Sequence, residues 1–211
     1  MTGVQTCALP ICVVEAMELI GSTQVQGRAT LAGNLCNGSP AADSVPAMMA
    51  ANAVATIVGP NGARDCTVAD IPVGPGKTSL TKGDVVTSIY LPARADNSGD
   101  AYLRFIPRTE MDIAVSAAGV SLTIDDGGTI TDARVSLGAV APTVLVVDAA
   151  AKAIIGTKLD DDAIAGLTSA CAAACNPIDD KRGTIEFRTK TAAVLAKRAA
   201  LIAYRRAGGL K

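Results

Sequence analysis

Two long β-strand patterns joined by a tight turn constrain the fold of this chain more than any other feature. Residues 112–125 (DIAVSAAGVSLTID) and 129–140 (TITDARVSLGAV) are rich in small and β-branched residues. The DDGG turn at 125–128 between them is typical of a β-hairpin. The preceding stretch, 101–108 (AYLRFIPR), has the same strand character. Three such segments in succession predict an antiparallel three-stranded sheet.

Two helical patterns follow these strands. The first spans about 159–175 and opens with DDD at 160–162, where acidic side chains complement the helix N-terminus. The second spans about 184–206 and has one apolar stripe, made of Ala192, Leu195, Ala199 and Ile202. Several Lys and Arg residues lie outside this stripe on the second helix. They form either a solvated face or a surface that binds a partner.

The first half of the chain mixes short elements. The patterns predict a helix over 13–20, an extended segment over 24–31 and a loop over 32–40. A helix over 43–52 follows, with Asp43 or Ser44 as its cap. Strands are expected over 53–58 and 84–92, and the polar stretch 93–100 is the best domain boundary. The chain is therefore expected to be α+β, in two pieces.

The composition excludes several classes of function. The chain has no His, so it holds neither a Ser-His-Asp triad nor a Cys-His pair nor a His-based zinc site. A formal net charge of −1 gives no sign of binding to nucleic acid or to an anionic membrane. No stretch approaches the about 20 apolar residues of a membrane span. The six cysteines lack the spacing of a metal cluster, so they are expected as small buried residues in a cytoplasmic protein.

The loop at 28–43 (RATLAGNLCNGSPAAD) is the best candidate for a binding site. Thr30 supplies a hydroxyl, Gly33 lets a ligand approach the backbone, and Asn34 both donates and accepts hydrogen bonds. Such a loop exposes backbone N–H groups of the kind that bind phosphate or ribityl oxygens. The same composition is also common in plain connections between elements.

The stretch 24–48 (QVQGRATLAGNLCNGSPAADSVPAM) resembles the second flavin-binding segment of the FAD (medium) subunits of molybdenum hydroxylases. This family includes the medium subunit of aerobic carbon monoxide dehydrogenase and the FAD domain of xanthine dehydrogenase. The chain departs from the family at Ala32, where relatives usually have the first Gly of a pair. Matching segments continue in the family's order, at 74–80 (GPGKTSL), 83–92 (GDVVTSIYLP), 102–122 (YLRFIPRTEMDIAVSAAGVSL, with Arg108, Asp112 and Ala114 in the expected places) and 176–199 (NPIDDKRGTIEFRTKTAAVLAKRA).

The resemblance implies a set of FAD-binding residues and no catalytic or metal-ligating residue in this chain. Thr30, Gly33, Asn34 and Asp43 would contact the FAD phosphates and ribityl chain, and Ala32 and Ser39 belong to the same cofactor-binding loop. Val86 would contact the flavin, and Arg104 stands where many relatives have a Lys near it. Arg and Lys share the charge but differ in geometry.

The resemblance also implies the partners. In the family, a molybdopterin-binding large subunit reduces a [2Fe-2S] small subunit, and the FAD of the medium subunit passes the electrons on to quinone or NAD. The chain is therefore expected to work in a hetero-oligomer. The alternative is a non-flavin scaffold or assembly protein of the same fold that docks the partner subunits.

The first residues differ from the rest of the chain. Residues 1–11 (MTGVQTCALPI) resemble a translated sequencing adapter, and the family's Gly-rich A-G-G-T-[DS] loop has no counterpart here. Residues 1–12 are therefore expected to be an artefact. Residues 13–95 would form the second half of an FAD-binding domain of the PCMH type, and 99–207 a C-terminal domain like that of the carbon monoxide dehydrogenase flavoprotein. On this interpretation the chain is a fragment with impaired FAD binding.

Overall fold

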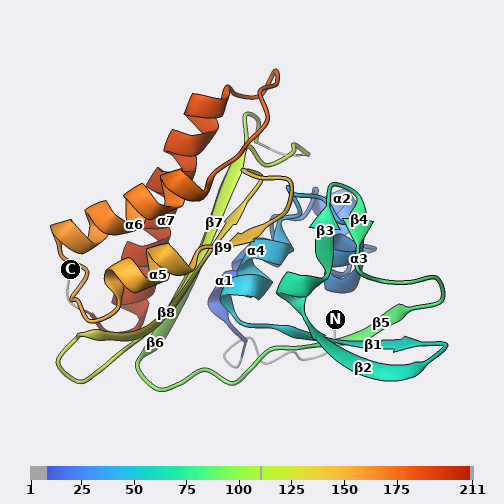
Figure 1. Cartoon of the computed structure of the whole chain (residues 1–211), viewed down its shortest axis with the longest axis horizontal. Helices are drawn as coiled ribbons and strands as arrows, with labels where there is room; N and C mark the ends of the chain where they lie inside the picture. Colours follow the sequence, from blue (N-terminus) through green and yellow to red (C-terminus); the bar gives the residue numbers. More distant parts are fainter. Residues whose placement is uncertain (1–8, 110, 210–211) are drawn as a thin grey trace.

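The computed structural model describes residues 9–109 and 111–209. A long antiparallel sheet crosses the molecule, with one group of helices on each side of it (Figure 1). This mixed architecture confirms the α+β class. The helices are α1 (Ile11–Met17), α2 (Thr23–Gln26), α3 (Leu31–Cys36), α4 (Ser44–Ala50), α5 (Asp148–Ile154), α6 (Asp161–Ala174) and α7 (Ile185–Arg206), with a 3-10 turn η2 at Val68–Asp70.

The strands form three antiparallel sheets with the orders β2-β1-β5, β3-β4 and β6-β7-β8-β9. Their bounds are β1 (Val54–Gly59), β2 (Gly62–Thr67), β3 (Pro72–Gly74), β4 (Lys77–Thr78), β5 (Val85–Tyr90), β6 (Ser98–Phe105), β7 (Ser116–Ile124), β8 (Ile130–Gly138) and β9 (Leu145–Val146). The expected three-strand unit is present as β6, β7 and β8. A fourth strand, β9, has only two residues, and it extends the sheet by pairing with β8.

Helices cover both faces of the large sheet, and side chains alternate between the two faces along each strand. Ala118, Val120 and Leu122 of β7 belong to a core shared with α5, α6 and α7. Ala117 of the same strand and Tyr102 of β6 belong to a second core, formed with α1 and α4. One sheet therefore supports both halves of the molecule.

Helix α1 is attached to the edge of the large sheet by side chains. The backbone N–H of Cys12 donates to the buried carboxylate of Asp100, and Glu15 accepts from the backbone N–H of Tyr102 at 2.9 Å. Glu15 also pairs with Arg206 at the end of α7. Cys12 is fully buried, and the helix begins at Ile11. The structure thus includes residues 9–12 in the packed fold, although they lie in the stretch expected to be an artefact.

Two local expectations were wrong. Residues 24–26 of the expected extended segment belong to helix α2, and most of the expected loop forms helix α3. The reason for α3 is a cap: the Thr30 hydroxyl accepts a hydrogen bond from the backbone N–H of Gly33 at 2.9 Å. The pattern also gave no sign of α5 or of β2, whose polar residues lie mostly exposed.

The cysteines fit the expectation of burial only in part. The five that the structure describes are all free, and Cys12 and Cys171 are buried. Burial raises the pKa of Cys171 to about 12 and that of Cys175 to about 11. Cys36, at the end of α3, is exposed, and Cys7 lies outside the described residues.

Candidate functional site

The candidate loop folds into helix α3 and the turn that leads to α4. Thr30 and Gly33 are exposed and contact each other through the cap, so a Cβ at position 33 would lie 2.9 Å from the Thr30 hydroxyl oxygen. Ala32 lies in the same turn and is partly buried. The backbone of this turn is therefore open to a ligand at Gly33, while its conformation is held by Thr30.

Asn34 joins α3 to α4. Its side-chain oxygen Oδ1 accepts from the backbone N–H of Ser44 at 3.1 Å and from the Ser44 hydroxyl at 2.7 Å. Ser39 stabilises the connection, since its hydroxyl accepts from the backbone N–H of Ala41 at 3.2 Å. Both residues therefore hold the loop in shape in this structure.

Gly38 brings the 74–80 segment against the loop. Its φ is +62°, a conformation that favours glycine, and a Cβ there would lie 2.9 Å from the backbone nitrogen of Lys77. The backbone N–H of Gly76 donates to the carbonyl of Gly38 at 2.9 Å. Two segments that resemble the family's flavin-binding motifs are thus in direct contact.

A buried ion pair connects the loop to the large sheet. Asp43 Oδ1 lies 2.8 Å from Arg104 Nη1, and the two side chains are 12% and 7% exposed. Burial raises the pKa of the Asp43 carboxyl, and the neighbouring Arg104 opposes that rise. Asp43 lies at the N-terminus of α4, but its side chain does not cap the helix as expected. The reason is that its carboxylate pairs with Arg104.

Val86 lies on β5, a strand that neighbours α3. It is half-buried, faces Ile57 of β1 across the sheet and packs against the second core. The predicted site residues are therefore brought together around α3 and Asp43, with Val86 on the adjoining sheet.

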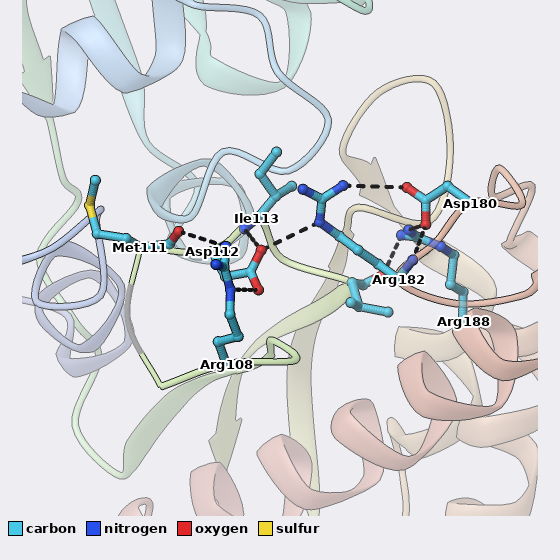
Figure 2. Close-up of polar contacts among 8 residues, drawn as sticks. Arg108, Met111, Asp112, Ile113, Asp180, Arg182 and Arg188 are labelled. Atoms are coloured by element: carbon cyan, nitrogen blue, oxygen red, sulfur yellow. Dashed lines mark hydrogen bonds and ion pairs between the residues drawn. The ribbon is translucent and has the colours of Figure 1, made fainter.

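Arg108 and Asp112 belong to an ion-pair network that Figure 2 shows. Arg108 Nε lies 2.9 Å from Asp112 Oδ2, and this hydrogen bond is the main reason why the pKa of Asp112 falls to about 2. Arg182 reaches Asp112 from the other side at 3.4 Å. Arg182 and Arg188 also both contact Asp180. The network thereby ties the turn after β6 to the segment before α7.

Sequence reasoning missed several residues of this region. Arg188 is 3% exposed and donates to the carbonyl of Val115 at 2.9 Å. Tyr102 is 2% exposed, and its hydroxyl has no hydrogen-bond partner among the described residues. The available signal was its position two residues before Arg104, because alternate residues of a strand share a face.

No group of three or more His, Cys, Asp or Glu residues within 9–109 and 111–209 is placed to hold a metal ion. No helix in the same ranges is long and apolar enough to cross a membrane.

Known families and proteins match both halves of this chain. The family model of the FAD binding domain in molybdopterin dehydrogenase matches residues 4–94. That of the CO dehydrogenase flavoprotein C-terminal domain matches residues 101–203. The carbon monoxide dehydrogenase medium chain of Afipia carboxidovorans is 35% identical over 90% of this chain and 65% of its own length. That of Hydrogenophaga pseudoflava is 31% identical over 94% of this chain and 68% of its own length.

A solved structure shares the fold across nearly the whole chain. Reconstituted CO dehydrogenase from Oligotropha carboxidovorans superposes with a TM-score of 0.91 and 33% identity, covering 97% of this chain and 71% of that one. The chain spans about two thirds of the length of the curated medium chains that it matches. From the two family models, these identities and the shared fold, the chain belongs to the family of FAD-binding medium subunits of molybdenum hydroxylases.

Proposed function

We propose that this chain is the FAD-binding electron-transfer subunit of a molybdenum hydroxylase complex. The observation that carries the proposal is the buried pair of Asp43 and Arg104. Asp43 comes from the segment that matches an FAD-binding domain, and Arg104 comes from the segment that matches the flavoprotein C-terminal domain. A charged pair at this junction suits a polar, anionic nucleotide better than an apolar ligand.

The residues present fit FAD. Gly33 leaves the backbone of α3 accessible, and Arg104 places a cation beside the loop. The buried Tyr102 hydroxyl has no hydrogen-bond partner among residues 9–109 and 111–209, and buried polar groups in proteins are nearly always paired. Thr30, Ala32, Gly33, Asn34, Ser39, Asp43, Val86 and Arg104 would hold the cofactor.

The role of the chain's own residues would be to bind FAD and to orient it. Arg104 balances negative charge, and Val86 gives an apolar surface for the flavin. When bound, FAD supplies the redox chemistry that carries electrons from [2Fe-2S] clusters to quinone or NAD. No general base from this chain is needed for that role.

The proposed complex is a cytoplasmic hetero-oligomer. Its other members would be a molybdopterin-binding large subunit and a [2Fe-2S] small subunit. The support is that the relatives are medium chains of carbon monoxide dehydrogenases, a name that implies larger and smaller companions.

Titration of the purified chain with FAD, followed by flavin fluorescence, tests the proposal. We expect weak but saturable binding, since the sequence predicts impaired FAD binding, and Arg104→Ala should weaken it further, because removing the cation leaves the Asp43 carboxylate buried without a partner. Arg104→Lys keeps the charge and should retain most of the affinity. Arg198→Ala is the matched control, since it removes an exposed arginine of α7, a helix that packs on β6, β7 and α6.

The result that contradicts the proposal is the absence of flavin from both the chain and its complex with partner subunits. Isolation of that complex with both partners but without flavin would instead favour the scaffold alternative. Circular dichroism of each variant separates a loss of binding from a loss of folding.

A further inference from the structure

Tyr102 has a fixed position and an unused hydroxyl. Its ring is 2% exposed in the core between β6 and α4. Its backbone N–H donates to Glu15 at 2.9 Å, and Glu15 is itself held by Arg206. The phenol oxygen, however, has no hydrogen-bond partner in the described ranges. A buried hydroxyl without a partner destabilises the folded chain.

The surroundings of this hydroxyl are the charged part of the candidate site. Tyr102 and Arg104 lie two residues apart on β6 and share a face of the sheet. Burial is the main cause that raises the pKa of Tyr102, and the negative charge of Asp43 adds to it while Arg104 opposes it. The phenol therefore stays neutral and remains a hydrogen-bond donor beside the pair of Asp43 and Arg104.

The opposite strand makes room at this position. Gly119 is the partner of Tyr102 across β6 and β7. A Cβ at Gly119 would lie 3.0 Å from the carbonyl oxygen of Pro46, in the first turn of α4. The absence of a side chain lets α4 approach the sheet closely, with Asp43 directly before that helix. The same packing that buries Tyr102 brings Asp43 to Arg104.

We infer that Tyr102 is a further ligand-binding residue of the FAD site, where its hydroxyl donates a hydrogen bond to an acceptor oxygen of the bound flavin nucleotide. This inference rests on the proposed function. It explains why an aromatic residue with a polar tip, rather than Phe, stands beside a buried charged pair. A donor held in place before binding loses little conformational freedom when the ligand arrives.

The test is Tyr102→Phe, which removes only the hydroxyl. Without FAD, the variant should unfold at the same temperature as the parent or a higher one, because the unpaired hydroxyl is gone. Its affinity for FAD, measured by isothermal titration calorimetry, should fall about tenfold, the equivalent of one hydrogen bond at about 1.4 kcal/mol. Titrations with FMN and with ADP then locate the acceptor on the flavin or the adenine side of the nucleotide.

The matched control is Tyr204→Phe. Tyr204 is also 2% exposed, but its hydroxyl donates to the carbonyl of Gly128 at 2.7 Å, at the far end of α7. This variant should lower the stability of the chain and leave FAD affinity unchanged. The two tyrosines are thus expected to give opposite results in the two assays.

Each outcome has a distinct meaning. If Tyr102→Phe binds FAD as tightly as the parent, the inference about Tyr102 is wrong and the proposed function stands. If Tyr102→Phe lowers the unfolding temperature as Tyr204→Phe does, the hydroxyl has a structural partner and the inference is again wrong. If the parent chain binds no FAD, both the inference and FAD binding by this chain fail together.

Discussion

At the scale of single residues, burial and hydrogen bonding shift acidic groups in opposite directions. Burial raises the pKa of Asp43 and of Asp100. Arginine partners and backbone N–H groups lower the pKa of Asp112 and Asp180. The raised group at Asp43 belongs to the candidate FAD site, whereas the lowered groups belong to the network that holds the turn after β6.

Asp112→Asn should reduce the dependence of stability on acid pH. The pKa of Asp112 is about 2 in the folded chain, against about 3.9 for an unfolded Asp. Its stabilising contribution is therefore complete above about pH 4 and is lost as the pH falls toward 2. We expect the variant to have a lower unfolding temperature than the parent at pH 7 and a smaller difference at pH 2.5.

Thermal unfolding followed by circular dichroism across this pH range measures the effect. Asp96→Asn is the control, because Asp96 is exposed and makes no ion pair or hydrogen bond with a described residue. Equal pH profiles for the parent and Asp112→Asn would show that the network does not stabilise the fold.

At the scale of elements, glycines determine how α4 meets the large sheet. Gly119 of β7 and Gly138 of β8 both face Pro46, and a Cβ at Gly138 would lie 2.7 Å from the Pro46 ring. The Ser136 hydroxyl donates to the Pro46 carbonyl at 2.6 Å between them. Small residues in two strands thus create the groove that seats α4 and its Asp43.

Gly119→Ala should destabilise the chain by about 1–3 kcal/mol, the usual cost of overpacking. The new methyl would lie 2.8 Å from the Ser136 hydroxyl oxygen and 3.0 Å from the Pro46 carbonyl oxygen. Urea unfolding measures the change. Gly27→Ala is the matched control, since nothing lies within 4 Å of its Cβ position. A cost no greater than that of Gly27→Ala would mean that the groove adapts.

At the scale of the whole molecule, one sheet belongs to two cores. The face of β7 with Ala118 packs on α7, and the face with Ala117 packs with α4. The salt bridge between Glu15 and Arg206 links the first and last helices across the edge of this sheet. The two family-matched segments therefore share one sheet and one ion pair, although they meet at the polar stretch 93–100.

We expect the chain to unfold in a single cooperative transition, because neither core can open without exposing the shared sheet. Scanning calorimetry tests this through the agreement of the calorimetric and van't Hoff enthalpies. The isolated segment 99–207 should expose Tyr102 and Ala117 and aggregate. Two resolved transitions in the full chain, or a well-behaved monomer of 99–207, would contradict the shared-sheet coupling.

The elements that were predictable are those with strong local signals. The DDGG hairpin fixed β7 and β8, and the apolar stripe of Ala192, Leu195 and Ala199 fixed α7. Helix α3 was missed because Gly, Asn and Ser are common in loops, and the Thr30 cap that favours the helix depends on the folded geometry. Strand β9 was missed because two residues carry no periodic pattern.

The sequence by itself determined the α+β class, the antiparallel order of β6, β7 and β8 and the family, because each rests on local periodicity or on motifs within a continuous stretch. Only the tertiary structure decided which side chains meet. The pairing of Asp43 with Arg104 and the isolation of the Tyr102 hydroxyl depend on how closely α4 packs on the sheet. That packing joins residues about 60 positions apart in the sequence, and no local pattern encodes such a distance.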